Sequence, residues 1–179
     1  SQIQLGITNA TYTSLGLVAA LGAGSATDAA SYITSNMTEF TNNWNVAPTS
    51  SSDMDYLNLT GSISSLSLGS RVSATFGDGI VRVSIVGSPS ISQGQIFNLI
   101  DWQAVSNMGG TFTTGGSTIY DATANVIAGD LDLPSLGAGL AWDVSAFKQY
   151  GVIVVVPEPS RVLLLLLGLV GLFLRRRRH

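Results

Sequence analysis

The chain has 179 residues, of which 45% are hydrophobic, so it can form one domain with a sizeable core and is unlike a disordered chain. It has no cysteine, which excludes disulfides and thiolate metal sites, and its low share of charged residues (11%) with abundant Gly, Ser and Thr suggests a β-rich extracellular protein. Residues 1–160 carry eleven acidic and three basic side chains, which argues against nucleic-acid binding, whereas the remaining residues hold five arginines and no acid.

Residues 1–51 form an N-terminal segment with one predicted helix. Five apolar residues recur there at spacings of three and four, which places them on one face of a helix within residues 27–44. They are Ala29, Ile33, Met37, Phe40 and Trp44. Thr27 or Asp28 is the expected helix cap. The chain begins at Ser1, which fits either a mature chain after removal of an export signal or a fragment.

Short strands separated by glycine-rich turns are predicted along residues 52–156. The clearest alternation places Val81, Val83 and Ile85 on one face and Arg82 and Ser84 on the other. The expected strands are Tyr56–Thr60, Ile63–Leu68, Val72–Phe76, Val81–Ile85, Ile96–Trp102, Leu131–Leu133, Leu140–Val144 and Val152–Val156, with Ile3–Leu5 and Thr11–Thr13 as candidates before them. Strands at this spacing favour a β-sandwich, with a β-solenoid as the alternative.

Residues 157–179 have the pattern of a membrane tail. Pro157, Glu158, Pro159 and Ser160 precede an apolar run over residues 162–174, and Arg175, Arg176, Arg177 and Arg178 follow it. As a helix the run would span roughly 20 Å at about 1.5 Å per residue, so Arg161 must extend toward the interface for the run to cross a bilayer. The final arginines are the expected cytoplasmic stop, which places the preceding residues outside the cytoplasm. The alternative is a buried core helix, which the lack of a polar face disfavours.

The order of these three parts closely resembles the PEP-CTERM sorting signal. The resemblance implies recognition by an exosortase, a multi-spanning membrane protease, with Pro157, Glu158 and Pro159 as the recognised motif and cleavage near it. It also implies an exported bacterial protein that passes through an inner-membrane intermediate and reaches the cell surface or the extracellular matrix, with exopolysaccharide as an associate. Because two prolines remove two N–H donors, we expect the motif to stay out of helices and central strands.

Residues 52–156 are similar to a β-module that often precedes PEP-CTERM tails and stands at the ends of autotransporter-associated β-strand repeats. The similarity lies in residues 52–61, 94–102, 110–112, 131–143 and 151–154. It implies no activity. It makes Trp102 and Trp142 packing anchors.

Residues suited to catalysis or metal binding are few. The single histidine is His179, so Ser-His-Asp and Cys-His arrangements and ordinary zinc sites are excluded. Asp53/Asp55 and Asp130/Asp132 are pairs spaced by two, which we expect to be solvated acids at strand ends. A calcium site and a hydrolase with two acids are the alternatives. Trp44, with Tyr12 or Tyr32, is a candidate for stacking on sugar rings.

The sequence therefore predicts a mainly β, sandwich-like ectodomain with one N-terminal helix and a single C-terminal transmembrane helix. The predicted function is that of a surface or matrix structural protein, not an enzyme, with no catalytic residue, metal or cofactor assigned. A glycan-binding adhesin is the first alternative and a hydrolase the second. The expected partners are the exosortase, the membrane and exopolysaccharide, without nucleic acid, and an exposed edge strand would permit self-association.

Overall fold

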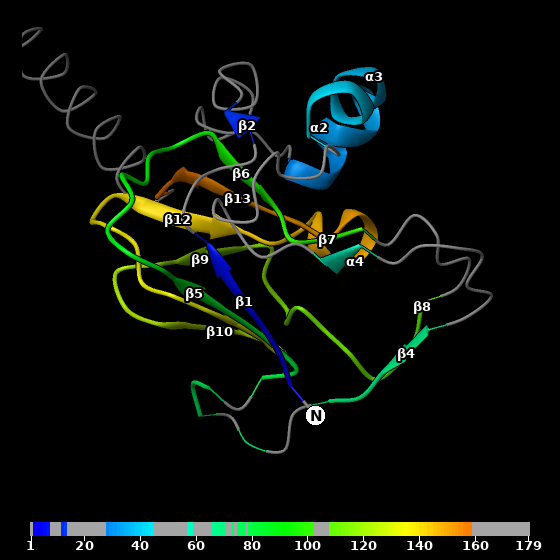
Figure 1. Ribbon diagram of the computed structural model, residues 1–179, viewed down its shortest axis with the longest axis vertical. Coiled ribbons are helices and arrows are strands. Elements are labelled where there is room, and N and C mark those ends of the chain that lie inside the picture. The colour runs from blue at the N-terminus through cyan, green and yellow to red at the C-terminus, as the bar shows by residue number, and fades with distance from the viewer. Residues whose placement is uncertain are drawn as a thin grey trace, which may run out of the picture.

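The computed structural model describes residues 2–7, 12–13, 28–44, 57–58, 66–70, 73, 75–77, 79–101 and 108–158. Most of the regular structure in this part of the chain is strand, and the longest strands form two sheets (Figure 1). The predicted predominance of strands is confirmed. The predicted transmembrane helix at 162–174 lies outside the described residues, and among those described no helix is long and apolar enough to cross a membrane.

The first sheet has four strands in the order β1-β5-β11-β10. These strands are β1 (Ile3–Ile7), β5 (Val81–Ile85), β10 (Val126–Ala128) and β11 (Leu131–Leu133). Strands β1 and β11 flank β5 and both run parallel to it, while β10 is antiparallel to β11. The start of the chain therefore pairs with a strand from its middle.

The second sheet has five strands in the order β2-β6-β13-β12-β9, all in antiparallel pairs. These strands are β2 (Tyr12–Thr13), β6 (Gln95–Asn98), β9 (Ile119–Asp121), β12 (Leu140–Asp143) and β13 (Val152–Pro157). Two short parallel pairs lie beside the sheets: β3 (Leu57–Asn58) with β7 (Ile100–Asp101), and β4 (Leu66–Leu68) with β8 (Met108–Gly110). Because β1 and β2 join different sheets, residues 1–51 contribute to both.

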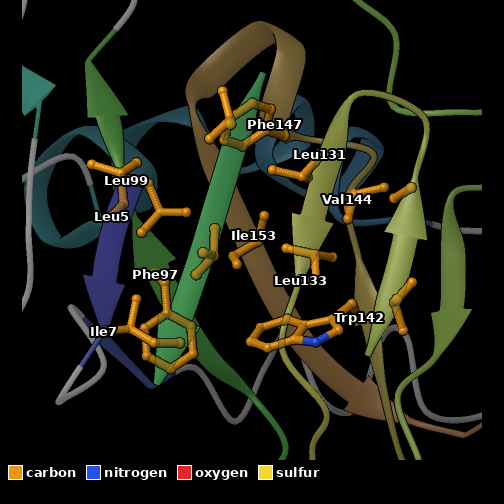
Figure 2. Packing of buried hydrophobic residues seen from close by; sticks show 14 of the residues in the cluster. Leu5, Ile7, Phe97, Leu99, Leu131, Leu133, Trp142, Val144, Phe147 and Ile153 are labelled. Atoms are coloured by element: carbon orange, nitrogen blue, oxygen red, sulfur yellow. The ribbon is translucent and has the colours of Figure 1, made fainter. Parts of the chain in front are cut away.

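The two sheets pack as layers on one hydrophobic cluster. Figure 2 shows Ile7 and Leu133 of the first sheet together with Phe97, Trp142 and Ile153 of the second. The rings of Phe97 and Trp142 meet edge to face with their centroids 5.9 Å apart. Fully burying a large apolar side chain stabilises a fold by about 1.5–3 kcal/mol. The described strands thus form two packed sheets, which agrees with the expected mainly β domain.

The predicted N-terminal helix is present, in three short pieces. They are α2 (Ala29–Ser35), α3 (Met37–Glu39) and the π-helical turn η1 (Phe40–Trp44). The backbone N–H of Ser31 donates to Asp28 Oδ1 at 2.8 Å, so Asp28 is the cap. In Figure 1, α2 and α3 lie beside the second sheet, on the side away from β1 and β5.

The apolar stripe predicted for this helix is partly wrong. Ala29, Ile33 and Phe40 are buried against Ile96 and other residues of the second sheet. Met37, however, is 41% exposed. The helix is interrupted at Asn36, whose φ of −129° ends α2, so Met37 does not continue the buried face of α2, whereas Phe40 packs on the sheet again.

The strand predictions are confirmed where the apolar pattern is strong and fail elsewhere. Strands β5, β11, β12 and β13 lie where they were expected. The strand predicted over Val72–Phe76 is wrong at its C-terminal end, because Thr75–Gly77 forms a bend and turn. Strands β8, β9 and β10 and the helical turn α4 (Phe147–Tyr150) were not predicted.

Candidate functional site

The predicted sorting motif begins inside the fold, at the end of β13. Pro157 is the last residue of this strand and lies opposite Leu140 of β12. The next residue, Glu158, donates its backbone N–H to the carbonyl of Gly139 at 3.0 Å. Both Pro157 and Glu158 are half-buried. Pro159, Ser160 and the arginine stop, Arg175–Arg178, lie outside the described residues.

Strand β13 holds the start of the motif firmly, because it is the middle strand of the second sheet. It is hydrogen-bonded to β6 on one side and to β12 on the other. Ile153 and Val155 belong to the cluster between the sheets, and Val152, Val154 and Val156 belong to the cluster beneath α2. A strand covered on both faces needs apolar residues at every position. Burial therefore accounts for the unbroken apolar run before Pro157.

Proline ends this central strand without costing it a hydrogen bond. The carbonyl of Val155 accepts from Gly94, next to β6, whereas the N–H of Glu158 points to Gly139, next to β12. Because backbone groups alternate sides along a strand, the nitrogen of Pro157 faces the side of β6. The chain turns away there, where Gln95 N–H donates to the carbonyl of Ser92. The expectation that the prolines keep the motif out of a central strand is therefore wrong for Pro157.

A buried carboxylate lies at the opposite end of the second sheet. Asp143, the last residue of β12, accepts the backbone N–H of Ala29 at Oδ2 (2.9 Å). Its Oδ1 accepts the backbone N–H (2.9 Å) and the hydroxyl (2.6 Å) of Ser145. The hydroxyl oxygen of Ser145 accepts the N–H of Ala30 at 3.0 Å. Asp143 and Ser145 thus join the start of α2 to the end of β12.

The surroundings of Asp143 act on its pKa in opposite directions. Burial raises the pKa of Asp143, and this outweighs the hydrogen bonds from Ser145 and Ala29, which lower it. Sequence reasoning did not assign Asp143 this role. The Asp-x-Ser spacing is the available signal, because an aspartate often accepts the N–H two residues on. The Asp-x-Ser spacing does not, however, predict that α2 packs against Asp143.

The pair Asp130/Asp132 is buried, so the expectation of solvated acids is wrong for it. Asp132 Oδ2 accepts the backbone N–H groups of Gly77 and Gly79, both at 2.7 Å. Asp130 Oδ2 accepts that of Thr113 at 2.9 Å. The two carboxylates hold separate loops against the first sheet. Among the described residues there is no group of three or more side chains suited to a metal ion.

The other acidic pair considered from the sequence, Asp53/Asp55, lies outside the described residues. Of the two acidic pairs, the structure therefore describes only Asp130/Asp132.

The aromatic residues singled out from the sequence fall into two groups. Trp142 is confirmed as a packing anchor, since it is fully buried and its Nε1 donates to the carbonyl of Pro134 at 2.8 Å. Tyr32 is half-buried and packs on the cluster beneath α2, with its hydroxyl 3.4 Å from Glu39. Trp102 and the side chains of Tyr12 and Trp44 lie outside what the structure describes.

Comparisons with protein-family models, with curated proteins and with solved structures found no match to this chain. A function must therefore be argued from the chain itself. Its two informative features are the motif at the end of β13 and the buried carboxylates that accept backbone N–H groups.

Proposed function

We propose that this protein is an exported structural component of a bacterial cell surface or extracellular matrix. An exosortase-type membrane protease sorts it through residues 157–179. The observation that carries the proposal is the order of Pro157–Ser160, the apolar run and Arg175–Arg178, directly after a β domain. The run at 162–174 inserts into the membrane as a single helix, and the arginines stay on the cytoplasmic side.

The position of the motif supports this proposal. Pro157 and Glu158 lie at one end of the domain, where strand β13 ends. A protease that acts on an extended backbone meets the chain at a fixed distance from the folded domain. The domain itself is then the part that is delivered to the surface.

The buried acids support a structural role over the hydrolase alternative. Asp130, Asp132 and Asp143 each accept hydrogen bonds from backbone N–H groups. These bonds fix loops and the start of α2, a task that needs no substrate. The carboxylates of a glycoside hydrolase must instead face a bound sugar and a water molecule.

The test is fractionation of the full chain in a bacterium that has an exosortase, with an epitope inserted at the exposed residue Gly116. The motif variant is Pro157→Ala/Glu158→Ala/Pro159→Ala. The matched control changes three residues of the neighbouring loop, Ser88→Ala/Pro89→Ala/Ser90→Ala. We expect wild type and control to leave the inner membrane at reduced mass, and the motif variant to remain there at full length.

Two results would contradict the proposal. Processing of the motif variant like wild type would show that the motif is not the signal. If all three proteins remain in the inner membrane at full length, the tail is a plain anchor. Urea unfolding of each variant is the control for folding, because Pro157 and Glu158 pair with Leu140 and Gly139 at the start of β12.

A further inference from the structure

Three connections between the two sheets gather at the end where β13 leaves the domain. They are residues 86–94, 122–125 and 134–139, which are named here the exit face. The backbone N–H of Leu136 in one connection donates to Ala122 in another, and the bonds from Gly94 to Val155 and from Glu158 to Gly139 join connections to β13 and to the residue that follows it. In Figure 1 these connections lie to the left, where β12 begins, and α4 lies at the other end.

The three connections of the exit face contain no charged residue. They consist mainly of Ser, Gly, Ala and other small or uncharged residues, and Val86 is exposed to 51%. The charges nearest to them are Asp121, at the end of β9, and Glu158. At the opposite end of the same sheets, Asp28 and Asp101 are half-buried and Lys148 is exposed, whereas Asp130 and Asp143 are buried.

The length of the chain brings the exit face close to the apolar run. Four peptide steps separate Glu158 from Val162, and a fully extended chain covers at most about 14 Å in four steps. The headgroup layer on each side of a bilayer is roughly 5–8 Å thick. If the run enters the bilayer at Val162, the exit face cannot stand far above the headgroups.

We propose that the exit face lies against the lipid headgroup layer while the protein is anchored in the membrane. This inference rests on the proposed function, because it needs residues 162–174 to enter the bilayer. The domain is acidic, and anionic headgroups repel acidic residues within about one Debye length. The three uncharged connections limit this repulsion at the end that the short connection holds near the membrane, where Asp121 and Glu158 are the adjoining acids.

The test uses the absence of cysteine in the full chain, which allows a single label at each chosen position. Ser88→Cys and Ala138→Cys place an environment-sensitive fluorophore on exposed positions of the exit face. Gln149→Cys and Ser31→Cys are matched exposed positions at the opposite end. Because β13 has six residues, that end is about 20 Å farther along the sheet.

The labelled chains are bound to phosphatidylcholine/phosphatidylglycerol vesicles that contain a headgroup-spin-labelled lipid as quencher. Fluorophores at residues 88 and 138 are expected to lose most of their emission, and those at 149 and 31 to keep it. Equal quenching at both ends, or stronger quenching at 149 and 31, would overturn the inference. Two labelled positions at each end keep the comparison possible if one cysteine variant fails to fold.

Flotation of the same vesicles tests membrane insertion separately from the position of the exit face. If the chain floats with the vesicles but quenching does not differ between the ends, the exit-face inference fails and the membrane tail stands. If the chain does not float, the apolar run does not insert. The membrane step of the proposed function then fails, and the inference fails with it.

Discussion

Replacement of Asp143 tests whether its buried carboxylate holds α2 to the second sheet. Asp143→Ala removes the acceptor for the backbone N–H groups of Ala29 and Ser145, and Ala29 is fully buried. Each buried donor left without a partner costs about 1–3 kcal/mol, so for these two donors we expect the free energy of unfolding to fall by about 2–6 kcal/mol. The matched control is Asp28→Ala at the half-buried cap of the same helix, for which a loss of about 0.5–2 kcal/mol is typical.

The assay is urea unfolding, followed by tryptophan fluorescence and by far-ultraviolet circular dichroism. Trp142 is fully buried between the sheets, so its emission reports on the core. The reasoning is refuted if Asp143→Ala costs no more than Asp28→Ala. That result would mean that Ala29 and Ser145 find other acceptors or water without loss.

The same residue predicts a pH dependence with a definite sign. Burial raises the pKa of Asp143, so the folded chain still holds a proton at pH values where the unfolded chain has released it. The stabilisation that comes from this raised pKa is fully present below the ordinary aspartate pKa of about 3.9 and is lost as the pH rises through the raised folded value.

Asparagine does not titrate, which makes Asp143→Asn the reference for this effect. The unfolding free energy of wild type minus that of Asp143→Asn should fall as the pH rises from the ordinary aspartate value upward. Denaturation series in several buffers measure this difference. A difference that grows with pH over that window would contradict the sign.

Two further predictions concern Gly151 and the processed end of the chain. Gly151 has a φ of +71°, and a Cβ there would collide with the carbonyl of Ile100, so Gly151→Ala should cost more than about 1 kcal/mol in urea unfolding. Gly116→Ala, where nothing lies within 4 Å of an added Cβ, should leave stability unchanged. If the chain is cleaved in its tail as proposed, the product should retain Glu158, because the N–H of Glu158 is bonded to Gly139. An intact mass that ends the chain before this residue would show that the end of β13 separates from β12 for cleavage.

Local patterns were sufficient for the strands whose side chains face the core in a regular order. Strand β5 alternates apolar and polar residues because one of its faces meets the other sheet. Strand β13 is apolar throughout because both of its faces are covered. The cap Asp28 was predictable for the same reason, since a carboxylate beside the first turn of a helix acts within three residues of sequence.

Patterns of this kind could not predict the strands that depend on their partners. Strand β9 has only half-buried and exposed side chains, and it is a strand because it pairs with β12. Strand β10 is three residues long and is held by β11. The parallel pairing of β1 with β5 joins segments far apart in the chain, and nothing in either segment specifies the other.

The buried acids were misjudged for a related reason. An aspartate in a sequence with few charges is expected at the surface, because burying it alone costs energy. Asp132 is buried because two glycine N–H groups, at positions 77 and 79, reach it from another part of the chain. Whether such donors exist is a property of the fold, which the spacing of Asp130 and Asp132 does not contain.

Proline at position 157 suits both the end of strand β13 and the start of the proposed tail. The sheet needs a strand end whose nitrogen can do without an acceptor, because the chain beside it has turned away from β13. The proposed membrane helix needs a segment before it that does not continue the helix back into the domain, and proline and the residue before it both disfavour helix. One proline therefore closes the strand and separates it from the tail. This explains how β13 and the motif can follow each other without a linker.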